Sequence, residues 1–218
     1  MTIFPSLKIP NTLAAGPGPG NTDPRVLQAY AAAGVADHMQ PDVLRGMIES
    51  KLMLREVFGT KNVYTYAIAG TGWSGLDSLH SAILPGDKVV AFNNGTFSGI
   101  DCLTIRMKAS TPADLAANPM NPQPENVVVV NVPHGQSVTG EMVDEALAEH
   151  KPMWAFMAHW ETGSGRINDI KGFNDACAKH GVMGLVDAVS SLGVGDFNID
   201  DYPAIVGWAS CPQKGVLA

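Results

Sequence analysis

The sequence predicts an α/β protein built on an open, mostly parallel sheet with helices on both faces. Apolar, strand-like runs alternate with helix-like segments along most of the 218 residues, which is the chain order of βα units. Several runs, such as residues 126–132 and 153–159, are apolar at consecutive positions, as strands are when both their faces are covered. Apolar residues make up 45% of the chain and charged residues 16%, so a globular protein with a substantial core is expected.

Two helices are expected ahead of the first strand. Residues 23–34 carry Pro24 near the start and Gly34 at the end, and these residues commonly begin and end a short helix. Residues 41–59 show the same pattern and predict a second helix, with a proline first, a glycine last and apolar side chains at helical spacing between them.

Strands and helices are then expected to alternate. The strand-like runs are residues 64–70, 88–92, 126–132, 153–159, 182–187 and 204–210. The helix-like segments are residues 74–84, 142–150 and 173–181. Because ligands of open α/β sheets gather at the carboxyl ends of the strands, the residues that follow each run are the candidates for chemistry.

A glycine pair follows the first of these runs. Gly70-Thr71-Gly72-Trp73 opens the helix expected at 74–84. Two glycines let the backbone approach a ligand closely, and the free N–H groups of a helix start attract an anion such as a phosphate. A plain glycine turn would have the same composition, and the third glycine of a dinucleotide-binding fingerprint is absent.

Three later runs also end in polar residues. The loop at 159–165 combines His, Trp, Glu, Thr and Ser with two glycines, as binding loops and solvated turns both do. Asp187 closes a buried strand, where a carboxylate needs a partner or caps the next turn. Lys214 follows the last run, and by itself it would be read as a surface lysine.

Considered together, these groups fit one ligand, pyridoxal 5′-phosphate (PLP). PLP requires a phosphate cradle, an aromatic ring to stack on, an acid facing its ring nitrogen and a lysine amine for its aldehyde. Asp187 would keep the ring nitrogen protonated, and Lys214 would bond the aldehyde and later move the substrate proton. The two residues are spaced along the chain as residues at neighbouring strand ends would be.

The order of the motifs resembles the class V aminotransferase family of fold-type I PLP enzymes, and most closely its alanine–glyoxylate and serine–glyoxylate branch. The motifs are GPGP at 16–19, GTGW at 70–73, HWETGSG at 159–165, VDAVSSLG at 186–193 and PQKG at 212–215. The likeness covers the chain from about Gly16 to its end. Five motifs in the family's order make a far more specific signal than any one of them.

Carried over residue by residue, the resemblance implies a catalytic pair, Lys214 at the cofactor's aldehyde and Asp187 at its ring nitrogen. It also implies a phosphate cradle of Gly70, Thr71 and Gly72 with Gln213, ring packing by Val189 and a hydrogen bond from Thr162 near the ring hydroxyl.

The aromatic ring that stacks on PLP falls in the family within a stretch that here reads NNGTFSG, residues 93–99. Phe97 is therefore the expected stacking residue, and Trp73 is a second candidate. The resemblance also implies that the GPGPG loop lies beside the substrate. Its prolines remove donors and stiffen the backbone, which suits a fixed wall, although a rigid entry turn would have the same composition.

The resemblance implies an aminotransferase that moves an amino group from a small amino acid of the alanine or serine type to glyoxylate or pyruvate by a ping-pong mechanism, in a homodimer. Residues 1–20 are expected to form a substrate-side segment, and residues 21–218 the PLP-binding large domain. Only four residues follow Lys214, whereas family members continue well beyond the lysine. We therefore expect that domain to be incomplete at its C-terminal end, with the C-terminal domain absent.

Two other functions stay open. A PLP-dependent lyase or desulfurase would use a nucleophilic cysteine beyond the lysine, but Cys102, Cys177 and Cys211 all precede Lys214. A non-catalytic PLP-fold chain that only pairs with a subunit would use apolar surface left exposed by absent elements.

Composition argues against several further classes. The net charge is −7 and no Lys/Arg cluster occurs, so a nucleic-acid partner is not expected. No apolar stretch is long enough to cross a membrane, and the first residues lack the basic-then-apolar pattern of a signal peptide. Three cysteines without metal-ligand spacing fit a reducing cytoplasm, and the six scattered histidines argue against a metal site.

Overall fold

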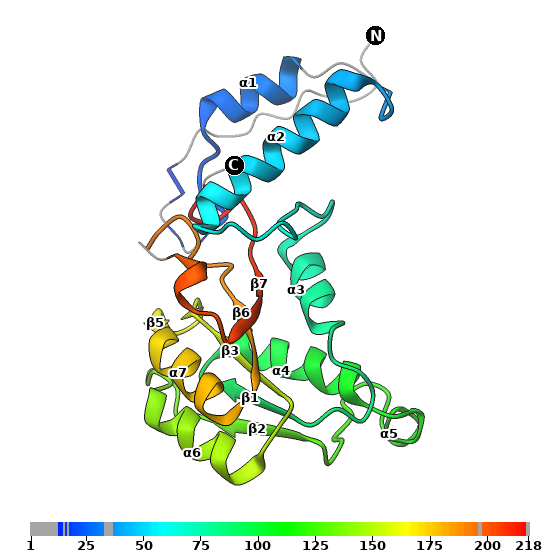
Figure 1. Ribbon diagram of the computed structural model, residues 1–218, viewed down its shortest axis with the longest axis vertical. Coiled ribbons are helices and arrows are strands. Elements are labelled where there is room, and N and C mark those ends of the chain that lie inside the picture. The colour runs from blue at the N-terminus through cyan, green and yellow to red at the C-terminus, as the bar shows by residue number, and fades with distance from the viewer. Residues whose placement is uncertain (1–12, 15, 17, 33–36, 196–197, 217–218) are drawn as a thin grey trace.

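The expected open α/β sheet is present in the computed structural model, which describes residues 13–14, 16, 18–32, 37–195 and 198–216 (Figure 1). Five parallel strands lie side by side in the order β2-β1-β3-β6-β7. Their bounds are β1 (Val89–Asn93), β2 (Val127–Asn131), β3 (Trp154–Ala158), β6 (Met183–Asp187) and β7 (Ile205–Ala209).

The three central strands form the most deeply buried part of the sheet. In β1, β3 and β6, four of the five residues are buried, and these runs of Val, Ala, Leu and Phe have no polar face. The outer strands β2 and β7 have fewer buried residues. Continuous apolar runs therefore predicted strands covered on both sides, as parallel strands require.

Helices cover both faces of the sheet. On one face, α6 (Gly140–His150) and α7 (Ile170–His180) pack with Phe92, Met157 and Val186 in one apolar cluster. On the other, α4 (Thr96–Ala109) and the end of α3 (Gly72–His80) pack with Phe156 and Leu185 in a second cluster. The alternation of strands and helices thus gives the expected three layers.

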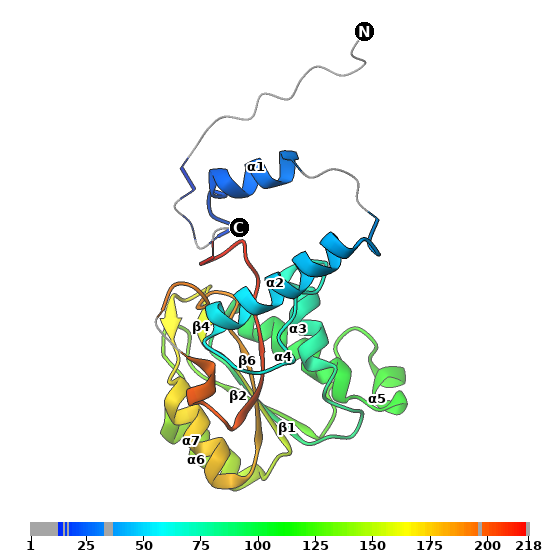
Figure 2. The same cartoon turned by 45° about the horizontal axis from the view of Figure 1, so that its top comes forward.

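The first two helices, α1 (Pro24–Ala32) and α2 (Pro41–Phe58), lie beyond one end of the sheet and have no buried residue (Figures 1 and 2). Helix α2 ends at Gly59, whose φ of 60° places it in the left-handed region that favours glycine. Thr60 and Lys61, which follow it, donate to Asp200 in the single-turn helix η1 (Ile199–Asp201). These contacts tie the end of α2 to the sheet domain.

Two expectations from the sequence are wrong in detail. Residues 64–70 do not form a strand, because no described strand lies beside them to pair with their backbone. Tyr64 and Tyr66 are 81% and 65% exposed there. The helix expected at 74–84 ends at His80 and continues as turns, since Pro85 disfavours a helical conformation of the residues before it.

Several elements were not expected from the sequence. They are helices α4 and α5 (Pro112–Ala117) and the short antiparallel pair β4 (Trp160–Glu161) and β5 (Arg166–Ile167). Residues 1–12, 15 and 17 of the expected substrate-side segment, and Gly34 of the first expected helix, lie outside the described residues. Within the described part of the chain, no helix has the length and apolar character needed to cross a membrane.

Candidate functional site

The candidate site lies at the carboxyl edge of the sheet. Strands β1, β3, β6 and β7 are neighbours and run in the same direction, so the segments that follow them leave the sheet side by side. All the residues singled out in the sequence come from these segments, from the start of α3 or from the GPGP loop. The topology therefore gathers residues that are far apart in the chain.

Asp187 is the last residue of β6 and is only 6% exposed. Its Oδ1 accepts a hydrogen bond from the backbone N–H of Val189 at 2.7 Å, which fixes the plane of the carboxyl. Burial, together with the nearby charge of Glu161, raises the pKa of Asp187 to about 6, while the bond from Val189 acts in the opposite direction. The capping role that the sequence left open is therefore real, and it uses one of the two oxygens.

Lys214 lies against the GPGP loop. A methyl group at Gly18 would come within 2.5 Å of Cδ and 3.2 Å of Nζ of Lys214, so the backbone of the loop packs directly on the lysine side chain. Gly18 has a φ of +103°, a conformation that glycine adopts without strain. The backbone N–H of Gly20 donates to the carbonyl of Gln213 at 3.2 Å, which fastens the loop to the lysine segment.

The expected phosphate cradle is the start of α3. Thr71 is the N-cap residue, but its side chain accepts no hydrogen bond from the first helical turn. The Thr71 side chain therefore does not occupy the N–H groups of that turn, and another acceptor can bind them. A methyl group at Gly72 would lie 3.0 Å from Sγ of Cys211 and 3.8 Å from Cγ2 of Val189. The helix start thus approaches the segments after β7 and β6 more closely than a larger residue would allow.

Phe97 lies in the first turn of α4 rather than in a loop, and it is 37% exposed. The turn is held by Glu161, which is 1% exposed. Oε1 of Glu161 accepts from the N–H groups of Phe97 at 3.2 Å and Gly163 at 2.8 Å, and Oε2 accepts from Ser98 N–H at 2.7 Å. A carboxylate at a helix N-terminus is favoured by these donors and by the helix dipole.

Sequence reasoning missed Glu161 and Ser190. The signal for Glu161 was its place three residues after the end of the buried strand β3, close to the kind of position that Asp187 has on β6. Ser190 forms a hydroxyl–hydroxyl hydrogen bond with Thr162, which draws the segment after β3 toward the segment after β6. Ser190 had no signal of its own, because serine is common in turns.

The structure brings most of the expected residues together. The start of α3 at Gly72 lies close to Cys211, and a methyl group there would also reach Val189, whose N–H donates to Asp187. Burial raises the pKa of the Cys211 thiol, the charge of Lys214 lowers it, and the charge of Asp187 raises it. Trp73, the second stacking candidate, is in the first turn of α3 and is 39% exposed.

The residues present fit PLP in three respects. A buried carboxyl closes a central strand, a lysine lies in the segment after the neighbouring strand, and a helix that starts with glycine approaches the segments after both strands. Each is required by a cofactor that has a basic ring nitrogen, an aldehyde and a phosphate.

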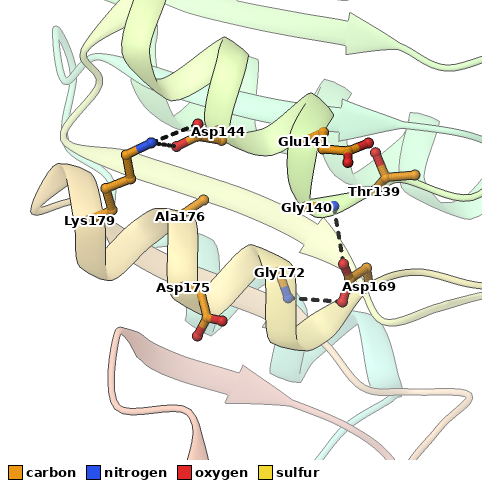
Figure 3. A pocket seen from close by; sticks show the side chains of 9 residues that line it. All are labelled: Thr139, Gly140, Glu141, Asp144, Asp169, Gly172, Asp175, Ala176 and Lys179. Atoms are coloured by element: carbon orange, nitrogen blue, oxygen red, sulfur yellow. Dashed lines mark hydrogen bonds and ion pairs between the residues drawn. The ribbon is translucent and has the colours of Figure 1, made fainter.

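A shallow groove of about 490 Å³ lies between α6 and α7, away from these residues (Figure 3). Three of its four acids are already engaged: Asp169 accepts from the N–H groups of Gly140 and Gly172, Asp144 pairs with Lys179, and Asp175 pairs with Lys171. None of the expected site residues lines it. The groove lies where two helices pack closely, and it is not a second candidate for the PLP site.

Comparison with known proteins finds clear relatives, although no family model matches the chain. The alanine–glyoxylate aminotransferase of Mus musculus is 32% identical over 188 residues, which are 86% of this chain and 42% of that protein. The (S)-ureidoglycine–glyoxylate transaminase of Bacillus subtilis is 31% identical over 199 residues, 89% of this chain and 44% of that protein.

Solved structures give the same result. The alanine–glyoxylate aminotransferase of Nostoc sp. superposes with a TM-score of 0.86 at 30% identity, covering 99% of this chain and 53% of that one. The ureidoglycine–glyoxylate aminotransferase of Bacillus subtilis gives 0.83 at 28% identity, covering 96% and 50%. The chain therefore spans about half the length of the relatives it matches.

Proposed function

We propose that this chain, whose homologues are class V glyoxylate aminotransferases, is the PLP-binding part of an aminotransferase. Its donor would be a small amino acid of the alanine or serine type, and its acceptor glyoxylate or pyruvate. Residues 1–20 would form the substrate-side segment and residues 21–218 the PLP-binding large domain. The observation that carries the proposal is that Asp187 ends β6 and Lys214 lies in the segment that follows the neighbouring parallel strand β7, packed against Gly18.

The remaining residues would hold the cofactor. Gly70, Thr71, Gly72 and Gln213 would bind the phosphate, Val189 would pack on the ring, Thr162 would bond near the ring hydroxyl, and Phe97 or Trp73 would stack. The uncapped start of α3 supports the phosphate assignment, because a helix N-terminus attracts anions. The nearness of Val189 to the start of α3, where a methyl group at Gly72 would lie 3.8 Å from its Cγ2, supports a ring and a phosphate bound side by side.

When bound, PLP supplies an electron sink for negative charge that develops at the α-carbon of the amino acid. The protein residues would supply orientation and proton transfer. Asp187, with one oxygen held by Val189, would face the ring nitrogen and keep its proton in place. Lys214 would accept the proton from the substrate α-carbon, and the Gly18 backbone would limit the directions its amine can take.

The first experiment is a visible absorption spectrum of the purified chain with added PLP. The parent protein should show the band of lysine-bound PLP and Lys214→Ala should not, whereas Lys171→Ala, an exposed lysine paired with Asp175, should behave as the parent. Addition of an amino donor alone should bleach the band, since the first half-reaction of a ping-pong enzyme needs no acceptor. A band that survives in Lys214→Ala, or a ternary complex required for turnover, would refute the proposal.

The desulfurase alternative gains nothing from the structure. All three cysteines are buried, and burial raises the pKa of Cys102 and Cys177 to about 12 and that of Cys211 above its ordinary value. A thiol with a raised pKa is a weak nucleophile at neutral pH.

We also propose that the protein acts in the cytoplasm as a homodimer. Large apolar side chains on α1 and α2 support the dimer, because Tyr30, Met47 and Ile48 are 76%, 64% and 61% exposed. Analytical ultracentrifugation should give twice the chain mass. A monomer at micromolar concentration would contradict this assignment.

A further inference from the structure

The carboxylate of Glu161 joins two segments that lie far apart in the chain. Glu161 is in β4, after the central strand β3, and it is 1% exposed. Its Oε1 accepts from the N–H of Gly163 at 2.8 Å, in the turn after β4, and from the N–H of Phe97 at 3.2 Å, in α4. Its Oε2 accepts from the N–H of Ser98 at 2.7 Å. One side chain therefore fixes the start of α4 to the segment that follows β3.

The backbone leaves a space that this side chain fills. A methyl group at Gly95, the N-cap residue of α4, would lie 2.4 Å from Cγ and 2.5 Å from Cδ of Glu161. A methyl group at Gly163 would lie 3.1 Å from Oε1. Gly95 has a φ of 179°, which is extended backbone that any residue adopts, so glycine is needed there for space. The Glu161 side chain is therefore held by packing as well as by hydrogen bonds.

Phe97 depends on this anchor more than a core residue would. Its side chain is 37% exposed, so packing alone does not fix its ring. The N–H groups of a first helical turn have no acceptor within the helix, and helix ends fray. Asn94 donates its backbone N–H to Oγ of Ser98 at 3.1 Å, but that bond lies within the segment after β1. The bonds to Glu161 place the turn relative to a second strand, β3.

The other end of the anchor is connected to Asp187. Thr162, next to Glu161, forms a hydroxyl–hydroxyl hydrogen bond with Ser190. Ser190 follows Val189, whose N–H donates to Asp187 at 2.7 Å. A short series of bonds thus runs from the carboxyl at the end of β6 to the turn that carries the Phe97 ring.

We propose that Glu161 is a positioning residue that places the Phe97 ring for stacking on the cofactor whose ring nitrogen Asp187 faces. This inference rests on the proposed function, which supplies the cofactor. It selects Phe97 over Trp73, because Trp73 begins a helix whose N-cap side chain accepts no hydrogen bond. Both oxygens of Glu161 are used by backbone donors, so Glu161 acts through the backbone of Phe97 and not on the cofactor itself.

The first test needs no cofactor. NMR relaxation gives order parameters for the backbone amides, which are about 0.85 in rigid segments and below about 0.6 in flexible ones. In the parent protein, the amides of Phe97 and Ser98 should be as rigid as that of Phe156 in β3. In Glu161→Gln these two should become more flexible while Phe156 stays rigid, and the exposed first-turn control Glu141→Gln should leave all three unchanged. Flexible amides in the parent, or equal rigidity in Glu161→Gln, would overturn the anchor.

The second test is a double-mutant cycle on the dissociation constant of PLP. Phe97→Ala should bind PLP about tenfold more weakly than the parent, because a stacking contact is lost. Glu161→Gln should weaken binding about fivefold when Phe97 is present and less than about twofold when it is already Ala, since no ring is left to position. A merely structural role would weaken binding by the same factor in both backgrounds, and that result would overturn the proposal.

Gly95→Ala repeats the cycle without removing the charge, and it serves if Glu161→Gln folds poorly. Its methyl group would displace the Glu161 side chain, so PLP binding should weaken as in Glu161→Gln, and only while Phe97 is present. Gly46→Ala, with open space around it, is the matched control and should bind as the parent does. An equal loss with and without Phe97 would count against the positioning role here too.

Failure of the proposed function gives a different pattern. If the parent protein bound no PLP, the proposed function would fall and the stacking role of Phe97 with it, while the order parameters would still show whether Glu161 fixes the start of α4. If the parent bound PLP through Lys214 and Phe97→Ala bound it equally well, the proposed function would stand and the positioning role would be overturned.

Discussion

Replacing Glu161 by Gln tests the connection between the segment after β3 and the start of α4. The two carboxylate oxygens accept from three backbone donors, at Ser98, Gly163 and Phe97. Glutamine keeps one acceptor oxygen and replaces the other by an NH₂ group. If the oxygen takes the place of Oε1, the NH₂ faces the N–H of Ser98, which is 0% exposed. A buried donor therefore loses its partner.

The magnitude follows from that loss. A hydrogen bond to a charged group contributes about 1.5–3 kcal/mol, and a negative charge at a helix N-terminus adds about 0.3–1 kcal/mol. Part of this is offset because the charge of Glu161, after burial, also raises the pKa of Asp187, and removing that charge relieves its repulsion of the Asp187 carboxylate. We expect a net loss of about 2–3 kcal/mol in the free energy of unfolding.

Urea unfolding followed by far-UV circular dichroism at neutral pH measures this directly. The midpoint should fall while the slope against urea stays unchanged, because the surface exposed on unfolding is the same. Glu141→Gln is the matched control, since Glu141 also lies in the first turn of a helix but is exposed, and it should cost about 0.5 kcal/mol or less. If Glu161→Gln cost no more than this control, the reasoning about the buried donors would be wrong.

Two further predictions concern the GPGP loop and His80, the buried last residue of α3. Gly18→Ala should weaken PLP binding by about tenfold, because its methyl group would overlap Lys214 and its φ of +103° adds strain of about 1–3 kcal/mol, whereas Gly16→Ala, with open space around it, should bind as the parent does. Equal binding by both variants in a PLP titration would contradict the contact. His80→Gln should remove part of the acid sensitivity of the fold. The folded pKa of His80, about 4, lies below its ordinary value of 6.5, so its stabilising contribution is present above pH 6.5 and is lost as pH falls toward 4, by about 1.4 kcal/mol per pH unit. Urea midpoints measured at pH 4.5 and pH 6.5 would differ equally in parent and variant if His80 were protonated in the folded state.

The sequence was sufficient for the parts of the fold whose signal is local. Strands β1, β3 and β6 were predicted because burial on both faces requires consecutive apolar residues. Residues 64–70 have the same apolar character but no described strand beside them, and a strand needs a partner as well as a propensity. Helix α4 was missed because its start contains Gly, Thr and Ser, and the group that caps it, Glu161, is 64 residues from Phe97.

The candidate site divides in the same way. Asp187 and Lys214 became candidates because one closes a strand-like run and the other follows one, and the order of the motifs resembled the family to which the homologues belong. The packing of Gly18 on Lys214 and of Gly72 on Cys211 depends on tertiary structure, so no local sequence pattern could predict it. Outside the candidate site, the burial of Asp101 in α4 and of His80 in α3 had no signal at all, because a polar residue within a helix is usually solvated.

Three buried acids, Glu161 in β4, Asp101 in α4 and Asp187 at the end of β6, show different ways in which a fold can hold a carboxyl out of water. Glu161 is satisfied by three backbone donors. Asp101 avoids the cost of a buried charge by a pKa of about 9, which keeps it neutral. Asp187 is intermediate, with one N–H bond and a pKa of about 6. Asp187 is therefore the one carboxyl of the three whose charge state a nearby cation could still shift near neutral pH. By linkage, a protonated ring nitrogen beside Asp187 would lower its pKa, and the pH at which PLP binding is lost would report that shift.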